Sequence, residues 1–328
     1  MTNFWVKLKK RGRPILVLAP MAGITDSPWR QICKDFGADV VVSEMASVTA
    51  LAYSPKATLA MLASTKSEAP YVVQLFGNNP EHFAQATKLL TNPKAVRKLG
   101  VKGYRVPQGI DINFGCPVAK VLKQQAGCAL FKDLAKSREV ITAVLNNTDL
   151  PVSIKTRTQV GEIKLLDFLK NITDLPVSAL MIHGRTLSQG FGGDIDYKIV
   201  AKARKYFSGV IIINGGINNS TKAEEALKLS GADGLGIGQG ALGNPWIFQE
   251  LKGKRENVKV TAKNLKDFNF VKKTIIKHAK LVEKYNSNFR EFRKHLLWYV
   301  AGLPDAKKLR GELMKVDSLA DVRKILRK

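Results

Sequence analysis

The chain has 328 residues, 45% of them hydrophobic, which is enough to bury a substantial core without disulfides or metal ions. Its 53 Lys and Arg residues outnumber 27 Asp and Glu residues, for a formal net charge of +26. This excess favours a polyanionic partner, although a lysine-rich, merely solvated surface would give the same balance. The N-terminus lacks the apolar segment of a secretory signal, and no run approaches the roughly 20 apolar residues of a membrane span, so we expect a cytoplasmic protein without membrane contact.

Three cysteines are spread along the chain, at Cys33, Cys116 and Cys128. They show no CxxC spacing, and no histidines cluster around them. This usage indicates a reducing compartment and argues against a metal site.

Short runs of apolar and β-branched residues recur eight times in the first 240 residues, and each precedes a stretch with helical spacing. This alternation is typical of parallel strands that are buried on both faces. We expect helices that include residues 80–90, 137–145, 165–169 and 221–229. The expected strands are residues 15–20, 38–43, 71–76, 109–114, 151–156, 179–183, 210–214 and 234–238. Eight strand–helix units predict an α/β protein with a closed (β/α)8 TIM barrel.

The strand pattern stops near Phe248, and the rest of the chain has a helical, basic pattern. Residues 268–285 and 289–299 have the spacing of amphipathic helices, and a short helix ending at Leu326 follows. Residues 251–328 contain 22 basic and 8 acidic residues, a net charge of +14. We therefore expect a small C-terminal helical domain that meets phosphate groups.

The boundary between the two parts depends on this change of pattern alone, because no Gly/Ser linker or low-complexity tract marks it. We place a barrel domain at residues 1–249 and a basic helical domain at residues 250–328.

Polar side chains interrupt five of the expected strands at their carboxyl ends, where (β/α)8 barrels build their sites. Any one of them alone would be read as a cap or as a loop anchor. Five together favour a shared ligand. They are Gln74, Asn113, Lys155, His183 and Asn214.

Two glycine-rich turns, at residues 214–217 and 236–241, follow the seventh and eighth expected strands. Glycine lets backbone N–H groups approach an anion, and barrels commonly hold phosphate at this place, although ordinary tight turns have the same composition. No GxGxxG opens a helix after a first strand. The single phosphate of a flavin mononucleotide therefore fits better than a resident dinucleotide.

Longer motifs resemble those of the tRNA dihydrouridine synthases and follow that family's order. They are APMAGITD at 19–26, QLFG at 74–77, DINFGCP at 111–117, KV at 120–121, KTR at 155–157, HGRT at 183–186, NGG at 214–216 and GALGNPW at 240–246. The tail adds RKH at 293–295 and WY at 298–299, so the resemblance covers about the whole chain. The bacterial, FMN-dependent type is the most similar.

The resemblance implies an oxidoreductase that reduces the C5–C6 double bond of particular uridines in tRNA, with FMN as cofactor and NADPH or NADH as reductant of the flavin. Hydride would pass from reduced FMN to C6, and the catalytic residue Cys116 would protonate C5. A thiol with an ordinary pKa near 8.5 stays largely protonated at neutral pH, as this role requires. The place of Cys116 between Gly115 and Pro117 argues against a purely structural buried thiol.

The resemblance also implies roles for the other strand-end residues. Lys155 would place positive charge where a reduced flavin becomes negative. Asn113 would contact the base, Arg157 the nearby tRNA backbone, and Arg293 and Lys294 the tRNA. The residues implied to bind the cofactor are Pro20, Met21, Ala22, Gln74, Lys155, His183, Asn214, Gly215, Gly216, Gly238 and Gln239.

The basic tail would hold tRNA while a uridine is extruded toward the flavin. Trp298 and Tyr299 lie near its basic residues, but aromatic side chains in such helices more often belong to a core. His82, His278 and His295 have no functional support and are expected on the surface or in packing. The basic residues with spacing for one face are Lys272, Lys273, Lys277, Lys280, Arg290, Arg293 and Lys294. We expect a monomer that binds no metal.

Three positions depart from the family's pattern. Gln239 stands where an arginine beside the flavin phosphate is usual, which removes a charge-assisted hydrogen bond. Gly216 replaces a usual acidic residue. Cys128 stands where Ala or Ser is common, and it could react with Cys116 under oxidation.

Two other functions are compatible with parts of the sequence. A flavin barrel acting on a small molecule, of the dihydroorotate or ene-reductase type, would not require the basic tail, and its turnover would not weaken steeply with salt. A catalytically silent tRNA-binding factor would not require Cys116 or Lys155.

Overall fold

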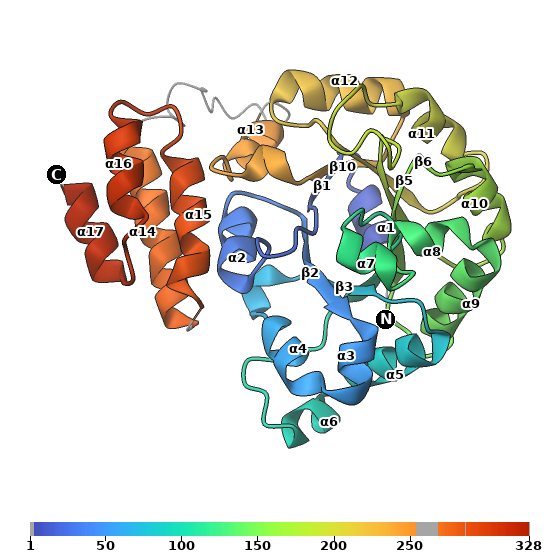
Figure 1. Cartoon of the computed structure of the whole chain (residues 1–328). Coiled ribbons are helices and arrows are strands. Elements are labelled where there is room, and N and C mark those ends of the chain that lie inside the picture. The colour runs from blue at the N-terminus through green and yellow to red at the C-terminus, as the bar shows by residue number, and fades with distance from the viewer. Residues whose placement is uncertain (1–2, 254–267, 286, 328) are drawn as a thin grey trace.

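The computed structural model describes residues 3–253, 268–285 and 287–327, and it contains the predicted closed barrel of parallel strands (Figure 1). The order of strands around the barrel is β1-β10-β9-β8-β5-β4-β3-β2. Their bounds are β1 (Ile15–Leu18), β2 (Val40–Ser47), β3 (Tyr71–Phe76), β4 (Gly109–Asn113), β5 (Val152–Arg157), β8 (Ala179–His183), β9 (Val210–Asn214) and β10 (Gly234–Ile237). A small antiparallel ribbon of β6 (Gln159–Val160) and β7 (Ile163–Lys164) follows β5.

Helices surround the barrel, as the alternating pattern predicts. They are α2 (Ser27–Asp35), α3 (Val48–Tyr53), α4 (Pro55–Met61), α5 (Pro80–Thr91), α6 (Pro93–Lys98), α7 (Ala119–Lys123), α8 (Cys128–Lys132), α9 (Leu134–Leu145), α10 (Leu165–Asn171), α11 (Tyr197–Ala203), α12 (Ser220–Ser230) and α13 (Ile247–Gly253). Short 3-10 turns lie at η1 (Lys66–Glu68) and η2 (Gln239–Ala241). Local capping sets several helix starts; Asn79, for example, accepts from the backbone N–H groups of Glu81 and His82 ahead of Pro80.

Apolar side chains fill the half of the barrel interior that lies toward the amino ends of the strands. Val17, Val40 and Ile212 belong to this inner cluster. At the amino ends of the strands, helix α1 (Phe4–Lys9) adds Trp5 and Leu8 to the same cluster and closes that end. Because the interior is packed there, a ligand site must lie at the opposite, carboxyl end of the strands.

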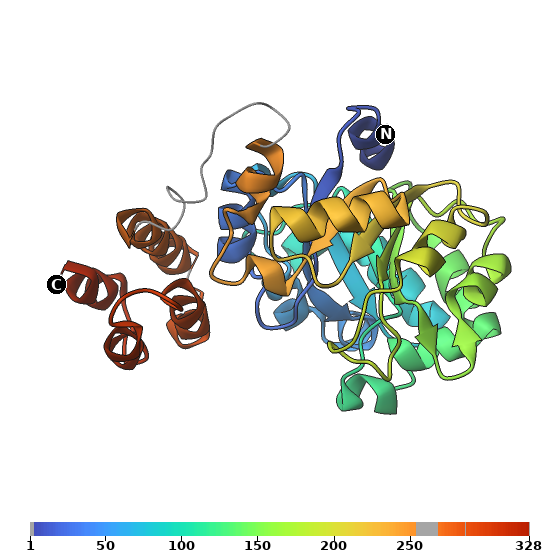
Figure 2. The ribbon, with the colours of Figure 1, turned by 90° about the horizontal axis from the view of Figure 1, so that it is seen from above.

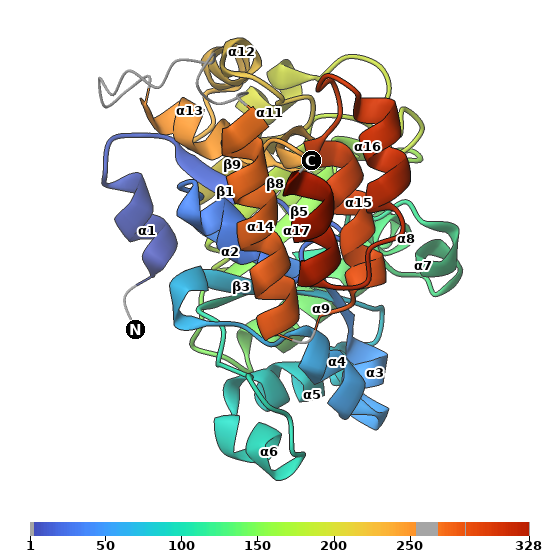
Figure 3. The ribbon, with the colours of Figure 1, turned by 90° about the vertical axis from the view of Figure 1, so that its left-hand side faces the viewer.

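The C-terminal tail forms a bundle of four described helices beside the barrel (Figure 2). They are α14 (Phe268–Lys284), α15 (Phe289–Tyr299), α16 (Ala306–Leu313) and α17 (Leu319–Arg327). Figure 3 shows the bundle lying in front of the barrel, next to α2. Trp29 of α2 packs against the bundle, and its ring centroid lies 4.8 Å from that of His295 and 5.5 Å from that of His278. We call this contact of Trp29 with His278, His295 and Tyr299 the joint between barrel and tail.

Most expected elements are confirmed, with shifted ends. Strand β2 runs four residues beyond its expected end because a bulge between Val42 and Met45 lets it continue. Helix α16 was not expected, since it is short and its apolar spacing consists only of Ala306, Leu309 and Leu313. The proposed domain boundary at residue 249 falls within α13, and residues 254–267 lie outside the described residues, so the two domain extents stay a prediction.

Candidate active site at the carboxyl ends of the strands

A cavity of about 620 Å³ opens at the carboxyl ends of the barrel strands. Strand register explains why the predicted residues meet there, since Asn113 pairs with Lys155, and His183 with Asn214, on neighbouring strands. The predicted residues that line this strand-end cavity are Pro20, Met21, Ala22, Gln74, Asn113, Cys116, Lys155, Arg157, His183, Asn214, Gly215, Gly216, Gly238 and Gln239. Arg293 and Lys294 are not among its lining residues.

A chain of buried hydrogen bonds orients the amides on one wall of the cavity. Ser153 Oγ donates to Asp111 at 2.6 Å, and Gln74 Nε2 donates to the other Asp111 oxygen at 2.7 Å. Gln74 Oε1 then accepts from Asn113 Nδ2 at 2.9 Å. Burial raises the pKa of Asp111 to about 6, and the Ser153 and Gln74 hydrogen bonds oppose that rise. Since Gln74 uses one N–H on Asp111, it keeps one N–H for a ligand.

Asn113 connects this chain to the loop that carries Cys116. Its Oδ1 accepts from the backbone N–H groups of Gly115 at 3.0 Å and Cys116 at 2.9 Å. The amide oxygen is therefore fully used within the protein. In this conformation Asn113 positions the cysteine loop, and its implied contact with the base stays a prediction.

The Cys116 side chain is half-buried and faces the strand-end cavity. Burial raises the pKa of its thiol, while a backbone hydrogen bond from Val118 and the charges of Lys155 and Arg157 oppose the rise. The thiol therefore keeps its proton at neutral pH, and the two nearby cations favour the thiolate once the proton has left.

The positive charge on the cavity floor is concentrated on Lys155. Burial lowers the pKa of Lys155 to about 8, and the charge of Arg157 contributes. Lys155 is therefore largely a cation at pH 7 with a proton held less firmly than in water. His183 is in the opposite state, since burial and then the charge of Lys155 lower its pKa to about 3. Neutral His183 can contact an anion only as an uncharged hydrogen-bond donor.

Arg157 is 2% exposed and is directed into the protein. Its Nε donates to the Gly115 carbonyl at 3.0 Å, and its Nη1 donates to the carbonyls of Thr186 and Gly190 at 2.9 Å. It thus links the cysteine loop to the loop after β8. The implied contact of Arg157 with the tRNA backbone stays a prediction that this geometry does not favour.

The glycine turns present bare backbone to the strand-end cavity. A Cβ on Gly215 would lie 2.6 Å from His183, and a Cβ on Gly240 would lie 1.9 Å from the Ile217 carbonyl oxygen, so neither position admits a side chain. Gly216 and Gly238 line the cavity directly. Arg185 also lines it, and its Nη2 lies 3.9 Å from the place of a Cβ on Gly216. A cation therefore lies beside the Gly216 turn of the cavity, which Gln239 also lines.

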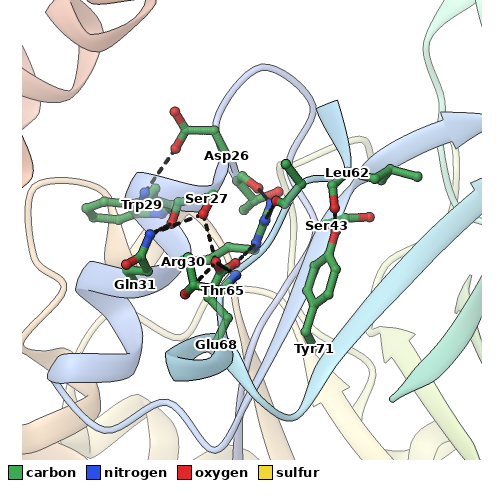
Figure 4. A network of polar contacts seen from close by, with 12 residues as sticks. Asp26, Ser27, Trp29, Arg30, Gln31, Ser43, Leu62, Thr65, Glu68 and Tyr71 are labelled. Carbon is green, nitrogen blue, oxygen red and sulfur yellow. Dashed lines mark hydrogen bonds and ion pairs between the residues drawn. The ribbon is translucent and has the colours of Figure 1, made fainter. Parts of the chain in front are cut away.

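The loop between β1 and α2 lines the cavity through Pro20, Met21 and Ala22. Polar contacts hold this loop, among them those of Arg30, which Figure 4 shows with its neighbours. Thr25 Oγ1 lies 3.2 Å from both the backbone nitrogen and the carbonyl oxygen of Met21. The Thr25 carbonyl accepts from the buried Arg30 guanidinium at 2.7 Å. The Arg30 side chain, which does not line the cavity, therefore holds this loop in place.

The helical tail reaches the cavity through Trp298, which is one of its lining residues. The approach is close, since a Cβ on Gly243 would lie 2.2 Å from the Trp298 carbonyl oxygen. Tyr299, His278 and His295 are buried in the joint with Trp29, as expected for packing residues.

The basic residues of the tail do not all face solvent freely. Arg293 donates to the Val316 carbonyl at 2.9 Å and to Asp317 at 2.6 Å, which joins α15 to the segment before α17. Lys294 pairs with Glu291, and its Nζ lies 3.4 Å from the place of a Cβ on Gly23, at the edge of the β1–α2 loop. Their contacts with RNA stay a prediction.

Several cavity residues were missed by sequence reasoning. Arg185 stands within the recognised HGRT motif and could have been selected as the cation nearest the phosphate turn. Met45, Phe191 and Asn218 also line the cavity, but no local signal marks them. Trp298 lines it too, although the sequence indicated only its place in the WY motif of the tail. Phe191 is 64% exposed and lies with its ring 6.0 Å from the Arg157 guanidinium carbon.

The described residues contain no group of three or more His, Cys, Asp or Glu side chains placed to hold a metal ion. Within the same ranges, no helix is long and apolar enough to cross a membrane.

The fold and the site define a (β/α)8-barrel enzyme with a protonated thiol, a partly buried lysine and two glycine-rich turns in one cavity. A family model described as "Dihydrouridine synthase (Dus)" matches residues 17–328. The chain therefore belongs to the dihydrouridine synthase family, as the motifs predict.

Individual relatives agree with this assignment. The chain is 36% identical over 304 residues to "tRNA-dihydrouridine synthase B" of Pseudomonas syringae pv. tomato, covering 90% of this chain and 85% of the relative. It is 32% identical to the "Probable tRNA-dihydrouridine synthase" of Rickettsia conorii, covering 94% and 92%. Histamine dehydrogenase from Rhizobium sp. 4-9 shares the fold with a TM-score of 0.52 at 10% identity, over 81% of this chain and 49% of that one.

Proposed function

We propose that this protein is a tRNA dihydrouridine synthase that uses FMN to reduce the C5–C6 bond of uridines in tRNA, with NADPH or NADH as the source of electrons. The observation that carries the proposal is the common cavity, into which the Cys116 thiol, the Lys155 ammonium and the glycine turns all face. Family membership supplies the reaction class, and the cavity supplies a residue for each requirement of that reaction.

The residues present fit a flavin mononucleotide. A cavity of about 620 Å³ is in the usual range for small-molecule sites. Its phosphate end would be formed by the bare backbone of Gly216 and Gly238 together with Arg185, and its ring end by Met21, Gln74 and Lys155. When bound, FMN supplies the hydride for uracil C6.

The protein's own part in the reaction is to place and deliver a proton. Asn113 holds the backbone of Cys116 so that the thiol faces the cavity. Cys116 donates its proton to C5 of the uracil, and the charges of Lys155 and Arg157 stabilise the thiolate that remains. A proton from water then restores the thiol.

Uridine must leave its stack to enter the cavity, which costs a few kcal/mol and must be offset by contacts with the RNA. Helix α15 reaches the cavity through Trp298, and the basic helix α14 packs against α15 and α2. These two helices would provide the phosphate contacts. We therefore keep residues 250–328 as the tRNA-binding part of a cytoplasmic, monomeric enzyme.

The decisive experiment is mass mapping of dihydrouridine in tRNA from cells with and without this gene. We expect loss at defined positions, restored by the wild-type gene and not by Cys116→Ala. An unchanged dihydrouridine map would contradict the proposal. Turnover of tRNA by the purified enzyme should also fall steeply with salt, whereas turnover of a small substrate would not.

A further inference from the structure

Cys128 lies directly beside the loop that carries Cys116. Its backbone N–H donates to the Cys116 carbonyl at an N···O distance of 3.1 Å. The preceding residue, Gly127, has a φ of +60°. A Cβ placed on it would lie 2.8 Å from the Cys116 carbonyl oxygen and 3.1 Å from the Cys116 Cβ. Because position 127 carries no side chain, the two segments meet backbone to backbone.

This approach is close enough for a covalent link. A direct backbone hydrogen bond joins the two residues, and disulfides form between residues whose Cα atoms are about 4.4–6.8 Å apart, a separation that such hydrogen-bonded neighbours can adopt. Cys33, the third cysteine, is completely buried within α2, and its charged neighbours are Asp26 and Asp35 rather than residues of this loop. The pairing of Cys116 with Cys128 is therefore the one that the backbone favours.

The two thiols differ in access. Cys116 is half-buried and lines the strand-end cavity, while Cys128 is fully buried at the start of α8. A small oxidant that enters the cavity reaches Cys116 first, and Cys128 is then positioned to react with the product. The Arg157 guanidinium stands next to both segments and donates to the Gly115 carbonyl at 3.0 Å.

We propose that Cys116 and Cys128 form a redox-active pair that a hydroperoxide converts to a disulfide, which reversibly withdraws the catalytic thiol. The Cys116 thiolate attacks one oxygen of hydrogen peroxide, the O–O bond breaks, and water leaves, so that Cys116 becomes a sulfenic acid. The Cys128 thiol attacks this sulfur, the S–O bond breaks, and a second water leaves with its proton. Two thiols and one peroxide thus give one disulfide and two waters.

The chemistry of the site sets the rate of this oxidation. Burial raises the pKa of Cys116 and raises that of Cys128 to about 11, while the charge of Arg157 opposes both shifts. Since the thiolate is the attacking species, oxidation is slow at neutral pH and accelerates as the pH rises toward 9. The pair therefore responds to sustained peroxide rather than to a brief exposure.

The test uses the FMN-loaded, full-length enzyme treated with hydrogen peroxide and then with a thiol-blocking reagent. We expect a Cys116–Cys128 cross-linked peptide in an unreduced digest, at least about a 10-fold loss of dihydrouridine formation, and recovery of activity with dithiothreitol. Cys128→Ser should keep the basal activity, but peroxide should drive its Cys116 to sulfinic acid, and dithiothreitol should not restore it. Cys33→Ala is the matched control and should behave as wild type.

Three outcomes overturn the proposal. They are irreversible oxidation of Cys116 in the wild type without the cross-linked peptide, equal recovery of wild type and Cys128→Ser with dithiothreitol, and no oxidation at either cysteine. The effect on activity rests on the proposed function, but the cross-link is read by mass alone. An enzyme without activity on tRNA would still form it, so the two proposals can fail separately.

Discussion

Arg30 and Glu68 form an ion pair in which both side chains are completely buried, with 2.6 Å between Arg30 Nε and Glu68 Oε2. The remaining Arg30 donors reach the carbonyls of Thr25 at 2.7 Å and Ala63 at 2.8 Å. Glu68 in turn accepts from the Ser27 hydroxyl at 2.7 Å. The pair therefore connects the cavity-lining loop after β1 to the segment that enters β3.

Replacing Glu68 by Gln should destabilise the protein strongly. Breaking a buried pair from one side leaves a desolvated guanidinium without its counter-ion, which costs about 3–5 kcal/mol. Chemical denaturation would measure the loss in free energy of unfolding. Glu139→Gln, which breaks the exposed Lys136–Glu139 pair, is the control and should show no measurable loss. Equal effects of the two variants would contradict a structural role for the buried pair.

Replacing Cys116 by Ala should lower dihydrouridine formation by about 10²–10⁴-fold, since a positioned proton donor contributes that much. FMN binding should be unchanged, because the residues proposed to hold the cofactor remain in place. Single-turnover reduction of tRNA, with flavin absorbance measured in parallel, separates the two effects. A variant that retained full turnover would remove Cys116 from the mechanism.

The activity should decline as the pH rises through about 8, where Lys155 loses its proton. Below that pH the positive ammonium stabilises the negative charge that collects on the reduced flavin. The titration of Cys116 comes later, because burial raises its pKa above the ordinary value. A pH profile of kcat/KM should show the decline in wild type, a low and flat response in Lys155→Met, and a retained rate at pH 9 in Lys155→Arg. A decline of equal size in Lys155→Met would assign it to another group.

Arg185 should carry much of the affinity for the FMN phosphate. Charge-assisted hydrogen bonds contribute about 1.5–3 kcal/mol, so Arg185→Ala should raise the FMN dissociation constant by about 10- to 100-fold. Adding Gln239→Arg to that variant should recover part of the affinity. Arg138→Ala, on the outer helix α9 and paired with Asp174, is the control and should bind FMN normally. An unchanged dissociation constant in Arg185→Ala would show that backbone donors suffice.

Acid should weaken the fold through the joint between barrel and tail. Burial lowers the pKa of His295 to about 3 and that of His278 well below its ordinary value. Among the described residues, His278 Nε2, His295 Nδ1 and Trp29 Nε1 are buried without a hydrogen-bond partner.

Both imidazoles are therefore neutral in the folded protein, while the unfolded chain gains two protons near pH 6.5. Stability is fully present above that pH and falls below it, by up to about 2.7 kcal/mol per pH unit. Urea denaturation at pH 7.5 and pH 5.5 would measure this loss, which His278→Phe should reduce. His82→Gln, on the partly exposed start of α5, should leave it unchanged. A pH dependence equal in all three proteins would exclude the joint as its cause.

The sequence by itself determined the barrel, the order of its strands along the chain and the residues at their carboxyl ends. These features are local, since a short apolar run that ends in Gln74, Lys155 or His183 predicts a strand and its carboxyl end without information on the neighbouring strands. Parallel register then brings strand ends together, so most predicted site residues line one cavity. The family motifs are equally local.

Only the tertiary structure decided which partners each side chain takes. In the folded protein Arg157 donates to backbone carbonyls, and Arg293 pairs with Asp317 within the tail. Trp298 lines the cavity although it lies more than fifty residues beyond the last strand in the sequence. The tertiary structure also placed Cys128 against Cys116. Hydrogen bonds and packing between distant segments carry no periodic signal along the chain, because they depend on how whole elements dock.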